Sequence, residues 1–181
     1  DLPAPYVFVP GNHYSPSTIL SLQKFGNVII MQGESISLRG LNIFGMGDPA
    51  SQTDTVALLP GHQVEEYVAK AKRIIGASPV DLIAVHTPAM AKALAGYGKV
   101  ILFGHDHRQY IETLKGSLLV NAGTTGAAGV RGLQSANEIP YTLVLLHFQQ
   151  LENSWQVMAA DVIKVYNLSS SFSLERKIFL P

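Results

Sequence analysis

The stretch KVILFGHDH, residues 99–107, joins a continuous apolar run to two histidines that stand two positions apart. Such a run predicts a β-strand that is buried on both faces, as in a parallel sheet. Gly104 lets the backbone bend after the strand, so that His105 and His107 can reach a common centre from one turn. The alternative interpretation is an exposed polar turn after a buried strand. The first interpretation requires polar residues at the ends of other strands to lie nearby, whereas the second does not.

Two further apolar strands end in the same way. VDLIAVH (80–86) ends in a histidine, and FVPGNHY (8–14) runs through Pro-Gly into Asn12 and His13. A single histidine after a strand is more often a hydrogen-bonded core or surface residue than a ligand. Here, however, three strand ends hold four of the six histidines, and ligands in layered α/β folds bind beyond the carboxyl ends of strands. We therefore expect one site built from three segments.

The residue types at these ends indicate the chemistry of the expected site. Asn12 offers a neutral carbonyl oxygen, which suits a hard or borderline divalent ion, and histidine is a common metal ligand. His13 could stay off the metal and act as a general acid. The chain has no cysteine, so thiolate zinc sites and cysteine nucleophiles are excluded, and His, Asp, Asn and Glu remain as ligands.

The distribution of strands and helices predicts the fold class. The first half of the chain alternates the two, whereas the second half is mostly strand, which predicts an α/β fold: a layered β-sandwich flanked by helices. The short strands between 28 and 45 are typical of a meander, and 122–140 is a long small-residue loop of a kind that often carries function. We expect strands at 5–9, 28–30, 35–38, 41–45, 80–86, 99–107, 109–113, 117–121, 141–149 and 154–165, and helices at 16–25, 61–76 and 88–95.

Composition narrows the class of partner. The 181 residues fit one domain with a substantial core. Thirteen basic residues balance thirteen acidic ones and charged residues make up only 14%, so neither a nucleic-acid-binding surface nor a polybasic membrane patch is indicated. No apolar run approaches the roughly 18 residues of a membrane span, so the chain as given is expected to be soluble. This balance of basic and acidic residues is more consistent with a small ligand than with a nucleic acid or a membrane surface.

Three motifs carry a resemblance to a known family: GNHY (11–14), VHTP (85–88) and GHDH (104–107). In this order and at this spacing they resemble the later signature blocks of the calcineurin-like metallophosphoesterase superfamily. The resemblance extends over nearly the whole chain. NAGTTGAAGVRG (121–132), followed by long strands, is similar to bacterial membrane-anchored members. The resemblance implies the layered α/β/β/α fold of that family over residues 1–181.

The resemblance also implies a role for each matching residue. Asn12, His86 and His105 would bind one metal and His107 the other, in a centre of two divalent ions (Mn, Fe, Zn or Ni). His13 would protonate the leaving oxygen while a metal-bridging hydroxide attacks a phosphate mono- or diester. The implied partner is thus a small phosphorylated substrate. Separately, Arg131 is the one guanidinium in the long loop and is our candidate contact to that anionic substrate.

Two departures from the family pattern shape the expectation. Its Asp-x-His and Gly-Asp blocks should precede GNH, whereas the Gly-Asp here, in GMGDP (45–49), follows it. Asp48 is therefore interpreted as a turn or strand-end carboxylate, and the chain as a fragment whose upstream part could carry the missing blocks and a membrane anchor. Tyr14 stands where the family usually has an acid that supports the histidine. These departures favour the alternative function, a non-catalytic interaction or regulatory module with the same fold.

Overall fold

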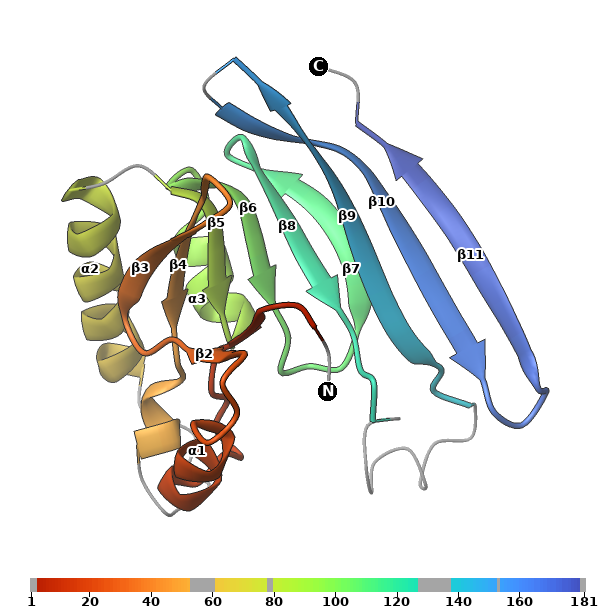
Figure 1. Cartoon of the computed structure of the whole chain (residues 1–181), viewed down its shortest axis with the longest axis horizontal. Helices are drawn as coiled ribbons and strands as arrows, with labels where there is room; N and C mark the ends of the chain where they lie inside the picture. Colours follow the sequence, from red (N-terminus) through yellow and green to blue (C-terminus); the bar gives the residue numbers. More distant parts are fainter. Residues whose placement is uncertain (1–2, 53–60, 78–79, 127–137, 153, 180–181) are drawn as a thin grey trace.

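Three β-sheets and three α-helices make up the part of the chain that the computed structural model describes, which is residues 3–52, 61–77, 80–126, 138–152 and 154–179 (Figure 1). The largest sheet has six strands in the order β3-β4-β5-β6-β8-β7. Its four central strands run parallel, and each edge strand pairs antiparallel with its neighbour. The strands are β3 (Glu34–Leu38), β4 (Leu41–Met46), β5 (Val80–Val85), β6 (Gly98–Phe103), β7 (Gln109–Leu114) and β8 (Ser117–Ala122).

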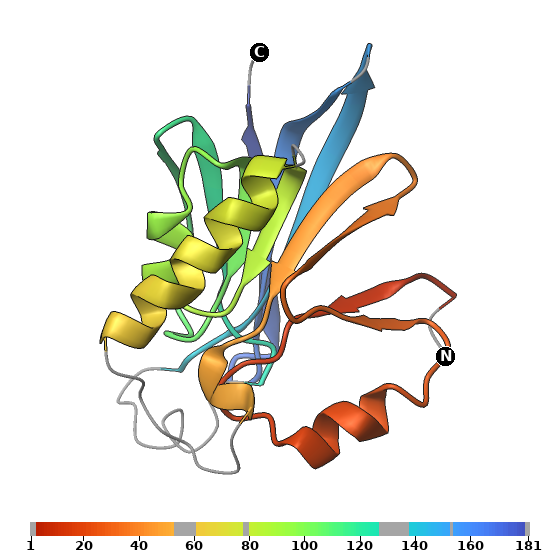
Figure 2. The same ribbon diagram turned by 90° about the vertical axis from the view of Figure 1, so that its left-hand side faces the viewer.

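Two smaller sheets complete the strand content of the described residues. An antiparallel sheet of three long strands follows the six-stranded sheet along the chain, and a short parallel pair precedes it. The three-stranded sheet contains β9 (Tyr141–Leu151), β10 (Ser154–Tyr166) and β11 (Ser171–Ile178), and the parallel pair contains β1 (Tyr6–Phe8) and β2 (Val28–Ile30). Figure 2 shows α2 (Gly61–Ala77) on one side of the large sheet and the β1–β2 pair, with α1 (Pro16–Leu22), on the other.

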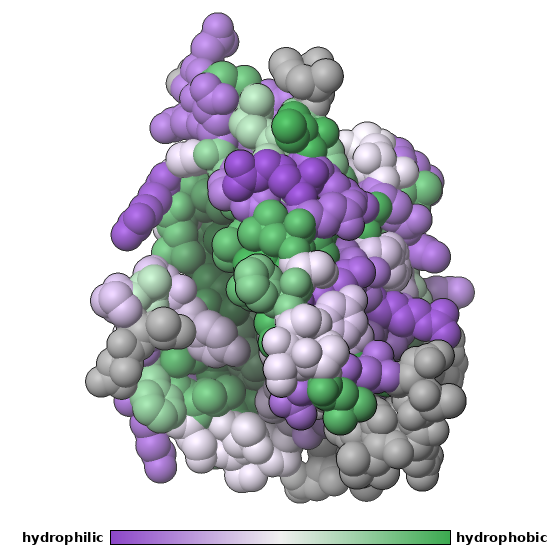
Figure 3. All heavy atoms as spheres, turned by 90° about the vertical axis from the view of Figure 1, so that its right-hand side faces the viewer, coloured by the Kyte–Doolittle hydropathy of each residue, from purple (hydrophilic) through white to green (hydrophobic). Residues whose placement is uncertain are grey.

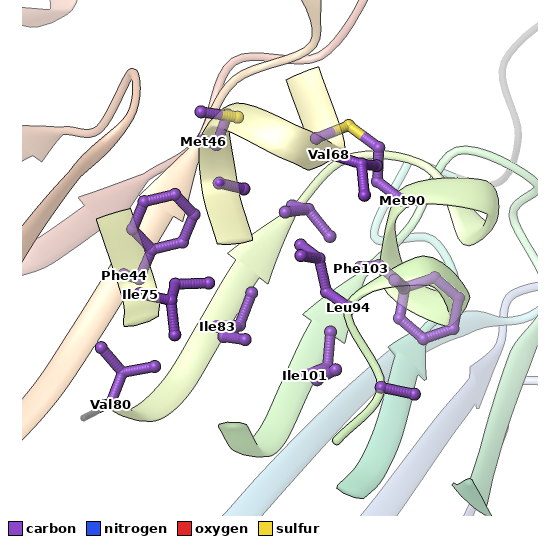
Figure 4. Packing of buried hydrophobic residues seen from close by; sticks show 14 of the residues in the cluster. Phe44, Met46, Val68, Ile75, Val80, Ile83, Met90, Leu94, Ile101 and Phe103 are labelled. Carbon is purple, nitrogen blue, oxygen red and sulfur yellow. The ribbon is translucent and has the colours of Figure 1, made fainter. Parts of the chain in front are cut away.

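The helices α2 (Gly61–Ala77) and α3 (Pro88–Ala93) cover one face of the six-stranded sheet. Their apolar side chains form a buried cluster with those of β4, β5 and β6 (Figure 4). Thr87 caps α3, because its hydroxyl accepts the N–H of Met90, and Pro88 fits the first helical turn. The cluster includes Phe44, Met46, Val68, Ile75, Ile83, Met90, Leu94, Ile101 and Phe103.

The opposite face of the six-stranded sheet packs less completely. A second buried cluster there includes Ile43, Leu82 and Val120, and several side chains of β9 contact it while only partly buried. Figure 3 shows an apolar hollow on the side of the molecule that lies to the right in Figure 1. The two faces thus differ, since helices cover one and strands cover part of the other.

The layered α/β architecture expected from the sequence, with strand layers flanked by helices, is confirmed, with two differences. The segment from 28 to 45 is not a meander, because β2 pairs in parallel with β1 and only β3 and β4 form a hairpin. The strand β11 (Ser171–Ile178) was not predicted. No helix in the described residues has the length and apolar character that crossing a membrane requires.

The parallel order of the sheet brings the expected strand ends together. β5 and β6 are neighbours, and the N–H of Gly104 donates to the carbonyl of His86 at 2.9 Å, just beyond their ends. At the end of β4, the N–H of Asp48 donates to the carbonyl of Pro10 at 2.8 Å and so joins the segment after β1 to the same edge. All three histidine-bearing segments therefore meet at one edge of the sheet.

Candidate metal centre

Three side-chain donors meet at this edge. His86 Nε2 lies 2.9 Å from Asn12 Oδ1 and 3.1 Å from His105 Nδ1. The two imidazole rings are nearly perpendicular, with an interplanar angle of 87°. One ring nitrogen carries either a proton or a lone pair, so it can make only one of these two contacts as a good hydrogen bond. The arrangement leaves one short contact between polar atoms unsatisfied in the chain alone.

A divalent cation would resolve this conflict, because it accepts a lone pair from every donor. Donors that bind one ion at about 2.1 Å lie about 3.0 Å apart in octahedral geometry and about 3.4 Å apart in tetrahedral geometry. The separations of 2.9 and 3.1 Å match the octahedral value. Among the described residues, no group of three or more His, Asp or Glu side chains is arranged to hold a metal ion. The candidate set consists of the imidazoles of His86 and His105 and the carboxamide of Asn12 that contacts His86. These residues fit a divalent ion with three neutral ligands.

The protonation state of His86 agrees with a ligand role. Burial is the largest cause that lowers the pKa of His86 to about 4; Asp48 opposes it, and the neighbouring His105, His13 and His107 contribute to the lowering. The ring is therefore neutral at physiological pH and keeps a lone pair, which metal coordination requires.

Gly11 makes room for this imidazole. A Cβ at residue 11 would lie 2.5 Å from Cε1 of His86, which is closer than nonbonded carbon atoms approach. Any larger residue would push the ring away from Asn12. The glycine of the GNHY motif thus has a direct structural role in the site.

The GHDH turn differs from the expectation in where the backbone bends. A Cβ on Gly104 would meet no atom within 4 Å, and the positive φ angles belong to the histidines, 77° at His105 and 60° at His107. Non-glycine residues seldom adopt this left-handed conformation, which costs about 1–3 kcal/mol each and is concentrated at functional sites. The prediction that Gly104 supplies the bend was therefore wrong.

The remaining candidates surround the three donors. One pocket is lined by His13, Tyr14 and His107 together with Asn12, His86 and His105, and the hydroxyl-bearing residues Thr124 and Thr125 line it as well. His13 and His107 are exposed, so their imidazoles are open to a ligand entering the pocket. The ring of Tyr14 packs edge-on against Phe8, with 5.0 Å between the ring centroids. Arg131, our candidate substrate contact, lies outside the described residues.

Asp48 is a neighbour of the site that sequence reasoning set aside. It follows β4 as expected of a strand-end carboxylate, but it is buried, with 6% of its surface exposed. One carboxylate oxygen accepts the N–H of Ala50 at 2.8 Å, and the negative charge acts on His86. The carboxylate therefore supplies negative charge near the imidazole of His86. The GMGDP sequence after a buried strand was the signal that could have identified it.

His147 lies on the other layer, as a strand-face residue of β9. Its Nε2 is 2.8 Å from Asp161 Oδ2, and Arg176 donates to both oxygens of the same carboxylate. The guanidinium and imidazole hydrogen bonds hold the pKa of Asp161 well below its usual range. This histidine belongs to a cross-strand ion network and provides a comparison for the histidines of the site.

Comparisons with known proteins give structural resemblance alone. No family model matches the chain, and no curated protein matches it. Vacuolar Protein Sorting 29 from Cryptosporidium parvum shares 16% identity, with 98% of this chain and 82% of that chain covered and a TM-score of 0.45. Wild-type Vps29 from Entamoeba histolytica, complexed with zinc, shares 12% identity over 99% and 85% of the two chains, with a TM-score of 0.41. A putative 5'-nucleotidase from Staphylococcus aureus shares 14% identity over 97% of this chain and 38% of that one, with a TM-score of 0.42. At these scores we base the function on the residues of the site alone.

We predict that His86 makes the metal-stripped protein sensitive to mild acid. Its pKa is about 4 in the folded chain and 6.5 in an unfolded one, so the unfolded chain binds the proton more readily as the pH falls from 6.5 to 4. Stability is therefore lost over this window, by about 2–3 kcal/mol at pH 4.5. Chemical denaturation at about pH 7.5 and pH 4.5 measures the loss.

The matched variant is His86→Gln, which keeps a neutral polar side chain but does not titrate. Its free energy of unfolding should fall less than that of the wild type between the two pH values. Equal losses in both proteins would show that the buried imidazole is not the group responsible.

Proposed function

We propose that the chain is a metal-dependent phosphoesterase domain that hydrolyses a phosphate mono- or diester. The observation that carries the proposal is the contact of one buried, neutral imidazole nitrogen with two further donors, Asn12 Oδ1 and His105 Nδ1. Three neutral donors at cation-like spacing suit Mn²⁺, Fe²⁺, Zn²⁺ or Ni²⁺. The resemblance of the GNHY, VHTP and GHDH motifs to metallophosphoesterases supports the same assignment.

The side chains divide into two roles. Asn12, His86 and His105 hold one divalent ion, and His107 contributes to a second ion in the complete centre. The bound ions supply Lewis acidity and an activated water for in-line attack on phosphorus. Thr124 and Thr125 lie on the pocket wall and offer hydroxyl groups to phosphate oxygens, and Arg131 is proposed as a further contact to the anionic substrate.

His13 acts as the general acid. It directly follows the proposed ligand Asn12, it is exposed and lines the pocket, and its imidazole is not among the donors that meet at His86 Nε2. In this position it gives its proton to the leaving oxygen as the bond to phosphorus breaks. Positioned general acids contribute typically 10²–10⁴-fold to the rate.

The alternative is a non-catalytic metal-binding module. Tyr14 favours it, because an aromatic ring held edge-on against Phe8 cannot orient His13 as a carboxylate would. Binding of a divalent ion without hydrolysis would select this alternative over the enzyme.

The first experiment is a calorimetric titration of the metal-stripped chain with Mn²⁺, together with hydrolysis of bis(p-nitrophenyl) phosphate. We expect the wild type to bind Mn²⁺ and to hydrolyse the diester. His86→Ala combined with His105→Ala should weaken binding by more than about 100-fold, beyond what changes outside the ligand shell cause. His147→Ala is the matched control, since it removes an imidazole from the other layer, and it should bind as the wild type does.

A wild-type chain that takes up no Mn²⁺ would contradict the proposed site. So would a double variant that binds as tightly as the wild type, because the ion would then lie elsewhere.

We predict a leaving-group effect for His13→Ala. Phenyl phosphate needs protonation of its leaving oxygen, whereas p-nitrophenolate leaves without it. The variant should therefore lose roughly 10²-fold or more in kcat with phenyl phosphate, and much less with p-nitrophenyl phosphate. Mn²⁺ affinity should be unchanged. An equal loss of kcat with both esters would show that His13 is not the acid.

A further inference from the structure

Asn121 is a buried polar side chain that the proposed chemistry does not use. It is the fifth residue of β8 (Ser117–Ala122), its exposed fraction is 0%, and it pairs in register with Phe103 at the end of β6. A buried carboxamide is costly unless its donors and acceptor are satisfied. Its hydrogen-bond partners therefore indicate what it does.

The carboxamide links β8 to the GHDH turn. Asn121 Nδ2 donates to Asp106 Oδ1 at 2.6 Å, and the same oxygen accepts the N–H of Arg108 at 3.1 Å. On its other side, Asn121 Oδ1 accepts the N–H of Gly123 at 2.9 Å. One buried side chain thus joins the middle of the GHDH turn to the start of the loop that lines the pocket.

The turn needs such a link. His105 and His107, on either side of Asp106, have φ angles of 77° and 60°. Residues with a Cβ leave this conformation unless the surrounding structure holds them in it. The hydrogen bond from Asn121 to Asp106 comes from a strand that is fixed in the sheet, and it acts on the residue between the two strained histidines.

We propose that Asn121 is a positioning residue which, through Asp106, holds His105 and His107 in the left-handed turn that directs their imidazoles into the site. The role in metal binding rests on the proposed function, whereas the effect on the turn does not. Asp106 thus accepts hydrogen bonds from the backbone of Arg108 and from the side chain of Asn121. Partners that orient ligands typically change metal affinity 10–100-fold when they are removed.

The test compares Asn121→Ala and Asp106→Ala with two controls. Ser117→Ala is the matched control at the other end of β8, since Ser117 is equally buried and its hydroxyl bonds Gly98 and Gly96. Asp106→Asn keeps an oxygen acceptor at the same place and should retain most of the wild-type Mn²⁺ affinity. The readouts are Mn²⁺ affinity by calorimetry, the visible spectrum of the Co²⁺-loaded protein, and the ¹³Cα and ¹³Cβ shifts of His105 and His107 without metal.

We expect both alanine variants to bind Mn²⁺ about tenfold or more weakly and to alter the Co²⁺ spectrum, while Ser117→Ala and Asp106→Asn stay close to the wild type. The ¹³Cα and ¹³Cβ shifts of His105 and His107 should move away from the values of a left-handed backbone in Asn121→Ala. They should stay unchanged in Ser117→Ala. Mn²⁺ affinity within twofold of the wild type in both alanine variants would overturn the proposal.

Failure of the proposed function gives a different result. If the wild type binds no Mn²⁺, the metal centre is wrong, and the histidine shifts alone decide the positioning role. Shifts that are unchanged in Asn121→Ala would then overturn it, and shifts that change there but not in Ser117→Ala would support it.

Discussion

The site depends on one imidazole that is buried between two other donors. His86 Nε2 lies 2.9 Å from Asn12 Oδ1 and 3.1 Å from His105 Nδ1, and a single nitrogen cannot satisfy both contacts by hydrogen bonding. Its pKa is lowered to about 4, chiefly by burial. The ring is therefore neutral at physiological pH, and protonation does not resolve the two competing contacts. Gly11 provides the space for the ring, and Asp48 is the nearby negative charge. A divalent cation satisfies the donors and balances that charge.

The sequence predicted the layers of the fold better than the pairing of their strands. Continuous apolar runs predicted β5 and β6 correctly, because a strand buried on both faces has no polar positions. Local pattern does not reveal which strand pairs with which, so β2 was assigned to a meander although it pairs with β1. The strand β11 was missed even though SFSLERKI alternates apolar and polar residues, the period of a half-buried strand. Its apolar side chains are exposed, with Phe172 at 74%, and its neighbours offered no buried run to mark it.

The residues of the candidate site that lie in short sequence motifs could be predicted from the sequence. GNHY, VHTP and GHDH contain the three candidate donors. VHTP and GHDH follow the neighbouring parallel strands β5 and β6, which end at one edge of the sheet. GNHY follows β1 of a separate sheet and is joined to that edge by the hydrogen bond between Asp48 and Pro10. The supporting residues were harder to identify. Asn121 lies 15 residues beyond Asp106, and no local pattern connects the two until the strand β8 returns beside β6. The bend of the GHDH turn was assigned to Gly104 on propensity, whereas the residues in the conformation that glycine favours are His105 and His107.

The most direct measurement is anomalous X-ray diffraction from crystals of the metal-stripped chain soaked in Zn²⁺, recorded on both sides of the zinc absorption edge. It locates the ion without assuming any activity. The proposed centre predicts an anomalous peak about 2.0–2.2 Å from Asn12 Oδ1, His86 Nε2 and His105 Nδ1. A map with no peak among these atoms, or with its peak at the pair of His147 and Asp161, would contradict it.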